Sequence, residues 1–521
     1  MVLRLQVLVV AGLMVLGQAL PALALDAEEL REKIAGGIAF YNARAHLVGQ
    51  DLYGYDGLRV EPRNEAFRVS ISGFSVLLDV ADMTRLELGD IGFTMTPAGE
   101  LAGDEMLRVS DIALPPAMRI AGPDGTTRRT IALGPVRLDS LWSFAYLTNL
   151  NMDILIEGFE MADPVGPDMV KIAEVAAELR SLDKDDGVYD MALDIRSLGF
   201  LSEAAGSKLY LSELAGLSKL TDYNLAAAAQ DLRDADPEAA GKPAALLETL
   251  LDLLLSDGTW SGGSEARLDA RGLRFVTGAE QDSVEIDSIG MGFALESLDE
   301  PLANASFTVG HLGLRGKGLS GAEGSLGQEL LPQETAVKVT LDKLPVQRII
   351  GELSSALSNG VAGEAANPEE SEQAQAGEPL PGRPGIVLDP LSAKLRDAVT
   401  EAGTTISLSD TRLAMPSAKL QAQGNFALDS EAVLGLSGNL LAELVGLDKL
   451  IALAQAAMGD PDASTRERAA TLIGTLGLLQ TYAARGEDNK GGPVDRYDLV
   501  IDPSGAITVN GKPLGPPPPQ E

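Results

Sequence analysis

The sequence predicts an α+β protein that is mainly β. We expect a long, curved antiparallel meander sheet that forms a half-open groove or a closed sandwich or barrel, with peripheral amphipathic helices. Apolar and polar residues alternate with a period of two over many short stretches, which is typical of strands with one apolar and one polar face. Glycine-containing turns separate these stretches, and a few segments with helical spacing interrupt them.

The first 24 residues have the pattern of a secretory signal peptide. Arg4 supplies the charge, residues 5–16 the apolar stretch, and residues 22–24 (ALA) the cleavage site. We expect cleavage after residue 24, export to the periplasm, and no stable transmembrane segment afterwards. The alternative is an uncleaved segment that anchors the protein in the inner membrane, because residues 5–25 make up a segment of about 20 residues that is just able to span a bilayer.

The next segment, Asp26 to Arg44, is predicted to be a helix. Asp26 and Glu29 have the spacing of a capping box. The apolar residues at helical spacing are Leu30, Ile34 and Ile38.

Strands are expected to follow this helix. The alternating apolar positions include Phe67, Val69 and Ile71; Leu107 and Val109; Met152, Ile154 and Ile156; and Tyr189, Met191, Leu193 and Ile195. The residues before Tyr189 (DKDDG, 183–187) predict a hairpin turn in which glycine takes a positive φ. Residues 497–509 predict a similar hairpin near the C-terminus.

One local pattern recurs. Residues 86–95 resemble residues 284–293, and residues 406–415 are a looser third copy. The apolar phase slips by one residue in the middle of each copy, which predicts a β-bulge. Chance similarity between amphipathic strands is the alternative.

The chain is expected to divide at a segment rich in Ala, Glu, Gly and Pro. Further helices are predicted at residues 243–255, 345–357, 388–402, 440–458 and 462–484. The expected regions are a signal peptide at 1–24, an N-terminal β-rich region at 25–358, a disordered linker or loop at 359–385, a C-terminal α+β region at 386–514 that is separate from or continuous with the first, and a proline-rich tail at 515–521.

Composition excludes several classes of function. The chain has 41 Lys plus Arg against 76 Asp plus Glu, so its formal net charge of −35 disfavours nucleic-acid binding. It has no Cys and only 2 His, which leaves no thiolate site and almost no means to build a His-based metal site. We therefore expect no cofactor and no metal.

No motif points to catalysis. His46 and His311 lack a local nucleophile or carboxylate pattern, so structural or surface roles are expected for both. Residues 183–187 faintly resemble a calcium loop, but a glycine stands at the fifth position and no Glu at the twelfth. We expect no catalytic residue, and a hydrolase is only a remote alternative.

Several segments together resemble the alphaproteobacterial periplasmic domain-of-unknown-function family 2125 (DUF2125). The segments that carry the resemblance are TLDKLP (340–345), GTTISL (403–408), GNFALD (424–429), GLSGNL (435–440) and DPSGAITVNG (502–511). More distantly, the chain looks like AsmA-like envelope proteins. That resemblance implies a long sheet that curls into an apolar groove for envelope lipids.

The expected function is therefore a non-catalytic periplasmic protein of the cell envelope that holds lipid or another apolar ligand in a β-groove. The candidate groove residues are Phe67, Val69, Ile71, Phe93, Met152, Ile154, Met291 and Phe293. The alternative is a structural or interaction protein, with an envelope protein as partner, in which the same residues form a closed core without a ligand.

Overall fold

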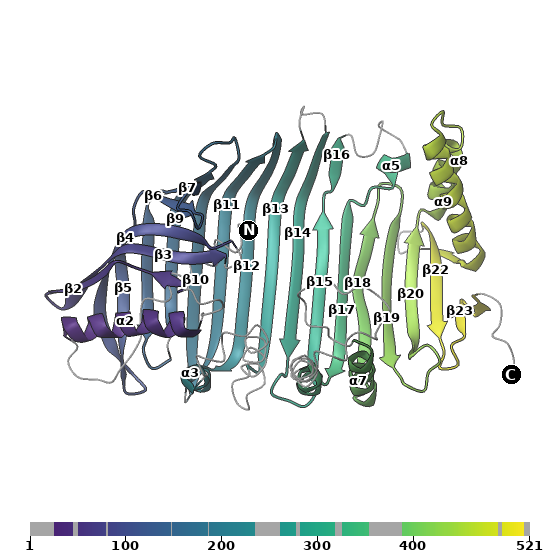
Figure 1. Cartoon of the computed structure of the whole chain (residues 1–521). Coiled ribbons are helices and arrows are strands. Elements are labelled where there is room, and N and C mark those ends of the chain that lie inside the picture. Colours follow the sequence, from purple (N-terminus) through teal and green to yellow (C-terminus); the bar gives the residue numbers. More distant parts are fainter. Residues whose placement is uncertain are drawn as a thin grey trace, which may run out of the picture. The chain divides into compact units, whose positions relative to one another are not determined.

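The computed structural model describes residues 26–44, 51–79, 82–146, 148–185, 187–234, 261–277, 282–317, 326–353, 388–487 and 492–514. As predicted, the chain is mainly β with a few helices (Figure 1). The chain divides into two compact units, and each is built on antiparallel meander strands. Unit 1 falls within Met1–Ala205, Ala215–Ser264 and Ile350–Leu391, and unit 2 within Gly206–Leu214, Glu265–Ile349 and Ser392–Glu521.

Among its described residues, unit 1 combines two helices with eleven strands. The helices are α2 (Ala27–Arg44) and α3 (Leu225–Asp234). The strands are β1 (Tyr53–Gly54), β2 (Gly57–Arg63), β3 (Ala66–Asp79), β4 (Thr84–Leu101), β5 (Asp104–Ala113), β6 (Ala117–Ala121), β7 (Thr127–Leu133), β8 (Val136–Ser143), β9 (Thr148–Ala162), β10 (Met169–Asp185) and β11 (Val188–Ala204). Strand β12 (Ser207–Asn224) has residues in both units. The predicted hairpin joins β10 to β11, and Gly187 has the expected positive φ of 84°.

Prolines interrupt two long strands of unit 1. β5 and β6 both pair with β4, and β7 and β8 both pair with β9, so the four segments act as two broken strands. The breaks fall at Pro115-Pro116 and at Gly134-Pro135, because proline has no N–H for the ladder. At Gly134 a Cβ atom would lie 1.7 Å from the carbonyl oxygen of Glu157, so only glycine fits there.

Helix α2 fills the core of unit 1. It begins at Asp26, whose Oδ1 accepts the backbone N–H groups of Glu28 and Glu29 at 2.9 and 2.8 Å, so the predicted N-cap is confirmed. The predicted apolar stripe of the helix is buried in one cluster with side chains of β3, β4 and β8–β10. In Figure 1, β3 and β4 cross in front of the following strands, close to α2.

Unit 2 contains the later strands. They are most of β13 (Gly263–Thr277), then β14 (Asp282–Glu296), β15 (Ala303–Leu312), β16 (Arg315–Lys317), β17 (Glu334–Leu344), β18 (Thr405–Ala414), β19 (Lys419–Leu428), β20 (Leu436–Val445), β21 (Ala484–Glu487), β22 (Pro493–Ile501), β23 (Ile507–Val509) and β24 (Lys512–Pro513). Its helices are α5 (Leu326–Glu329), most of α7 (Leu388–Glu401), α8 (Leu447–Ala457) and α9 (Ala463–Tyr482).

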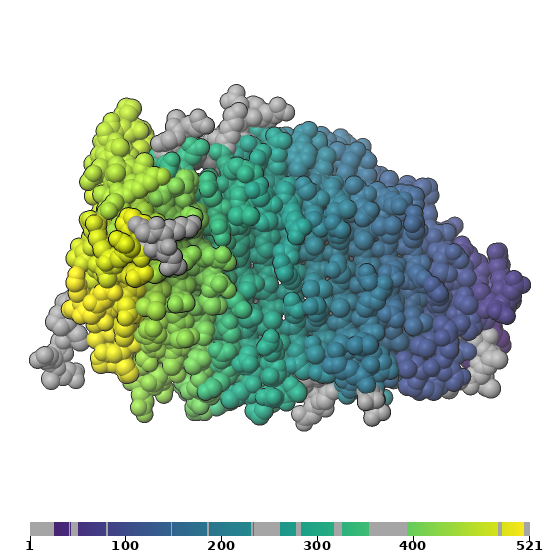
Figure 2. Space-filling model, turned by 180° about the vertical axis from the view of Figure 1, so that it is seen from behind, coloured from purple at the N-terminus to yellow at the C-terminus, as the bar shows by residue number. Residues whose placement is uncertain are grey.

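The strands of unit 2 follow one another in sequence order. Antiparallel pairing runs from β14 through β15, β17, β18, β19, β20 and β22 to β23. Figure 2 shows the same order from behind, as bands that pass from teal to yellow. Strands β17 and β18 flank the predicted linker and are direct neighbours, so the regions before and after it share one sheet.

The predicted C-terminal helical pair is present but begins later than expected. Residues 440–445 belong to β20, whereas the prediction placed them in the first helix. Gly446 separates strand from helix with a φ of 94°, a left-handed conformation that glycine adopts easily. Asp462 caps α9 through its carboxylate.

The predicted β-bulge is present in two of the three similar segments. The β3–β4 register shifts around Phe74 opposite Gly89, which has a φ of 76°. The register of β18 with β19 shifts between Leu408 and Thr411. In the second segment, β14 keeps one register with β15 and β16, so the prediction of a bulge is wrong for that side of β14.

Some predictions lie outside the described residues. These are the signal peptide at 1–24, the helix at 243–255, the linker at 359–385 and the tail at 515–521. Within the described ranges, none of the helices combines the length and apolar character needed to cross a bilayer.

Candidate functional site

Six of the eight candidate groove residues lie in the closed core of unit 1. Phe67, Val69, Ile71, Phe93, Met152 and Ile154 are all at most 9% exposed. They share one buried cluster with the apolar stripe of α2, namely Leu30, Ile34 and Ile38. The structure therefore places these six side chains against a helix of the same chain, where they form a packed interior.

The other two candidates lie on an open surface of unit 2. Met291 and Phe293 project from β14 and remain 45% and 44% exposed. The next strand, β15, contributes Phe307 and Val309 as their direct cross-strand neighbours. These two are 47% and 37% exposed, so four large apolar side chains form one exposed patch.

The strand register defines a larger surface around this patch, which we call the apolar face. It consists of the side chains of β14, β15 and β17 that share one side of the sheet. They are Ile289, Met291, Phe293 and Leu295; Ala305, Phe307, Val309 and His311; and Thr335, Val337, Val339 and Leu341. None of these residues carries a formal charge at neutral pH when the histidine is neutral.

The same side of the sheet is covered by helices further along. Leu420, Leu444 and Leu499 of β19, β20 and β22 pack in a cluster with Leu447 and Leu476 of α8 and α9. The exposed patch on β14 and β15 has no part in any of the described core clusters. Its large side chains therefore stand where a ligand or partner can reach them.

One polar pair interrupts the apolar face. His311 and Thr335 are direct partners across β15 and β17, and His311 Nε2 lies 2.9 Å from Thr335 Oγ1. His311 Nδ1 is buried and has no hydrogen-bond partner among the described residues. From the sequence we expected a structural or surface role for His311. The alternation of Phe307, Val309 and His311 is the signal that places all three on one side of the sheet, and the prediction did not use it.

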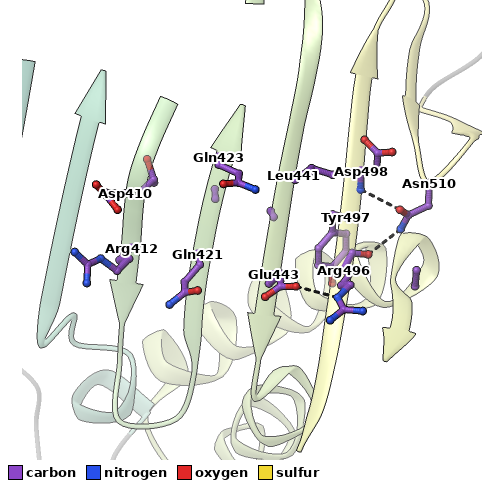
Figure 3. Close-up of a pocket in the computed structure, with 14 residues that line it drawn as sticks. Asp410, Arg412, Gln421, Gln423, Leu441, Glu443, Arg496, Tyr497, Asp498 and Asn510 are labelled. Carbon is purple, nitrogen blue, oxygen red and sulfur yellow. Dashed lines mark hydrogen bonds and ion pairs between the residues drawn. The ribbon is translucent and has the colours of Figure 1, made fainter. Parts of the chain in front are cut away.

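The opposite side of the sheet is polar. A shallow pocket of about 710 Å³ lies over β18, β19, β20 and β22, and Figure 3 shows the side chains that line it. Its charged groups include Asp410, Arg412, Glu443, Arg496 and Asp498. Arg496 Nε donates to Glu443 Oε1 at 2.9 Å, so two of these charges already satisfy each other. This arrangement is typical of a solvated sheet surface.

A second group of polar atoms lies inside unit 1. The side chain of Lys33 on α2 is buried, and its Nζ has no hydrogen-bond partner in the described part of the chain. The Glu29 carboxylate is 3.6 Å away, and the ring centroid of Phe144 is 5.1 Å away. Burial raises the pKa of the neighbouring Glu105, although the positive charge of Lys33 opposes that rise.

The described residues contain no cluster of three or more His, Asp or Glu side chains that could hold a metal ion. The faint calcium-loop pattern at 183–187 instead joins β10 to β11 as a hairpin turn, where Lys184 contacts Asp190 at 2.9 Å. Lys184 Nζ also donates to Asp222 at 2.6 Å. These charge pairs raise the pKa of Lys184 and lower that of Asp190.

Comparison with known proteins gave no match. Neither protein-family models, nor curated proteins, nor solved structures matched this chain.

Proposed function

We propose that this chain is a non-catalytic protein of the cell envelope that binds lipid acyl chains on the apolar face of unit 2. Export to the periplasm by residues 1–24 and the resemblance to family DUF2125 are parts of the same proposal. The observation that carries it is the exposed patch of Met291, Phe293, Phe307 and Val309, which no described helix covers. Each methylene buried there contributes about 0.8 kcal/mol.

Charge supports binding through apolar contact. The chain carries a formal net charge of −35, which repels anionic membrane surfaces. The apolar face offers aromatic and aliphatic side chains without a counter-charge for a phosphate. A ligand on this surface therefore gains its affinity from burial of its acyl chain.

The alternative, a partner that adds a strand to a sheet edge, has less support. The outer side of β22 is already paired with β21 and β23. At the other end of the chain, β2 is short and carries Arg59, Glu61, Pro62 and Arg63, which are residues that protect edge strands. The closed core of unit 1 does favour a purely structural role for that unit.

The test is lipid binding by the purified full-length protein, isolated without detergent from a periplasmic extract and analysed by native mass spectrometry. We expect co-purified acyl lipid, and uptake from phosphatidylethanolamine vesicles after delipidation. Phe307→Gln should weaken uptake several-fold. Leu312→Gln is the matched control, because Leu312 lies on the same strand, is 51% exposed and faces the other side.

A protein that is lipid-free, and stays so when offered vesicles, contradicts the proposal. Equal loss of uptake in both variants contradicts the assignment to the apolar face.

A further inference from the structure

The pair His311 and Thr335 gives the apolar face one polar end. Cross-strand partners on β14, β15 and β17 form rows across the apolar face. The row at one end consists of Ile289, His311 and Thr335, and the row at the other end consists of Leu295, Ala305 and Leu341. Beyond the pair, none of the side chains on the apolar face can donate or accept a conventional hydrogen bond. The face is therefore polar at one end and apolar along the rest of its length, as an amphiphilic lipid is.

Hydrogen-bond accounting leaves one donor of the pair unused. If the Thr335 hydroxyl donates to His311 Nε2, the ring carries its proton on Nδ1, which has no acceptor among the described residues. If Nε2 donates instead, the Thr335 hydroxyl hydrogen needs an acceptor. Because Nδ1 is buried, the donor that a ligand can reach is the hydroxyl of the half-buried Thr335, and an oxygen acceptor from a ligand would satisfy it.

The length of the apolar rows suits a long acyl chain. From His311 to Ala305 the strand advances by six residues, which is about 20 Å at the usual rise of a strand. Three neighbouring strands add a width of about 10 Å. A single extended acyl chain, or two side by side, fits along the strands.

Nearby charges favour an acceptor without a negative charge. Two guanidinium groups on the flanking strands β16 and β18 are already paired: Arg315 with Asp287, and Arg412 with Glu334 at 3.9 Å. An ionised carboxylate or phosphate at the polar end would face a strongly acidic protein, and the side chains of the apolar face supply no cation to balance it. An ester carbonyl accepts a hydrogen bond without this electrostatic cost.

From these observations we infer that the ligand is an uncharged acyl ester lipid, with its ester carbonyl at the pair of His311 and Thr335 and its acyl chain along the strands toward Leu295, Ala305 and Leu341. This inference rests on the proposed function, because it assigns an orientation and a chemical class to the lipid on the apolar face.

The test compares two lipids that differ only in the carbonyl group: 1-palmitoylglycerol and 1-O-hexadecylglycerol. We expect the full-length protein to bind the ester about three- to ten-fold more tightly than the ether, the ratio that one net hydrogen bond gives. In Thr335→Val and His311→Leu the ratio should fall to about one, while binding of the ether is retained. Thr308→Val, on the other side of β15, is the control and should keep the preference.

Histidine NMR provides a second readout. The chain has 2 His, so His46→Gln assigns the ring signals of His311 directly. The ester should shift the His311 signals more than the ether does, and should leave those of His46 unchanged.

The outcomes separate the two proposals. If neither lipid binds, the proposed function fails. If ester and ether bind equally, or the His311 signals respond to neither, the orientation is wrong while the proposed function stands. Tighter binding of palmitate than of the ester contradicts the inference that the acceptor group of the ligand is uncharged. Signals of His311 that change on dilution alone, with a dimer in sedimentation, assign the face to a second copy of the chain and overturn the inference.

Discussion

Asn510 and Asp498 are joined by two hydrogen bonds at the outer edge of β22, one between their backbones and one that uses the Asn510 side chain. The backbone N–H of Asp498 donates to Asn510 Oδ1 at 2.9 Å, and the backbone N–H of Asn510 donates to the Asp498 carbonyl oxygen at 2.8 Å. Asn510 Nδ2 donates to the carbonyl oxygens of Tyr482 and Arg496. This side chain thus bridges the stretches of β22 that pair with β21 and β23.

Replacing Asn510 with Ala should lower the free energy of unfolding by about 1–3 kcal/mol, because backbone groups lose their partners. Asn510 also has a φ of 50°, a conformation that Asn tolerates better than Ala. Urea unfolding followed by circular dichroism measures the change. Asn439→Ala, at an exposed position on β20, is the control, and an equal effect in both variants would refute the role of Asn510.

Phe93 and Phe293 should respond very differently to truncation. Phe93 is fully buried in unit 1, so Phe93→Ala should cost about 3–5 kcal/mol by leaving a cavity. Phe293 is 44% exposed on the apolar face, so Phe293→Ala should cost about 1 kcal/mol or less. Chemical denaturation of both variants checks this contrast. A large loss for Phe293→Ala would mean that the apolar face is packed against the protein itself.

Lys33 is expected to oppose stability. Its ammonium group is buried without a hydrogen-bond partner among the described residues, so Lys33→Met should raise the free energy of unfolding by about 1 kcal/mol. Lys419→Met, at an exposed position on β19, should change it by no more than about 0.5 kcal/mol. A destabilised Lys33→Met variant would show instead that the ammonium group has bonding partners in solution.

Asp495 should make stability depend on pH. Burial raises the pKa of its carboxyl above the ordinary value, and Arg485 at 3.6 Å only partly opposes this. The folded state therefore holds the proton more firmly than the unfolded state. The contribution of the protonated carboxyl is complete below the unfolded pKa and is lost as the pH rises through the folded pKa.

Asp495→Asn removes this titration. Relative to the unmodified protein, the variant should gain stability as the pH rises from the unfolded pKa of about 3.9 through the raised folded pKa, which thermal unfolding at a series of pH values would measure. A difference between the two proteins that does not change with pH would contradict the assignment.

Period-two alternation was sufficient to predict the meander, the glycine turn at 183–187 predicted the hairpin, and the capping box with apolar residues at helical spacing predicted the helix capped by Asp26. It could not separate the core from the apolar face. Val69 and Phe293 lie in equally alternating segments, and only tertiary packing determines that the first lies in the core with α2 while the second stays exposed. Alternation shows that a strand has an apolar side, but it carries no information about what covers that side.

Other features left no signal in the sequence. Residues 440–445 looked helical because several leucines there fit both periods, and Gly446 marks the true boundary. Asn510 is one of many polar residues, and its role depends on a left-handed conformation that only the folded edge requires.

The unbroken succession of strands from β14 to β23 makes unit 2 extensible. Apart from the short strands β16 and β21, each strand pairs with the strand before it and the strand after it along the chain, so a hairpin could be duplicated or deleted without rewiring the rest. Each hairpin would change the width of the apolar face by about 10 Å. Such a sheet gives evolution a direct way to change the area of the apolar face, by adding or removing hairpins rather than by redesigning a pocket.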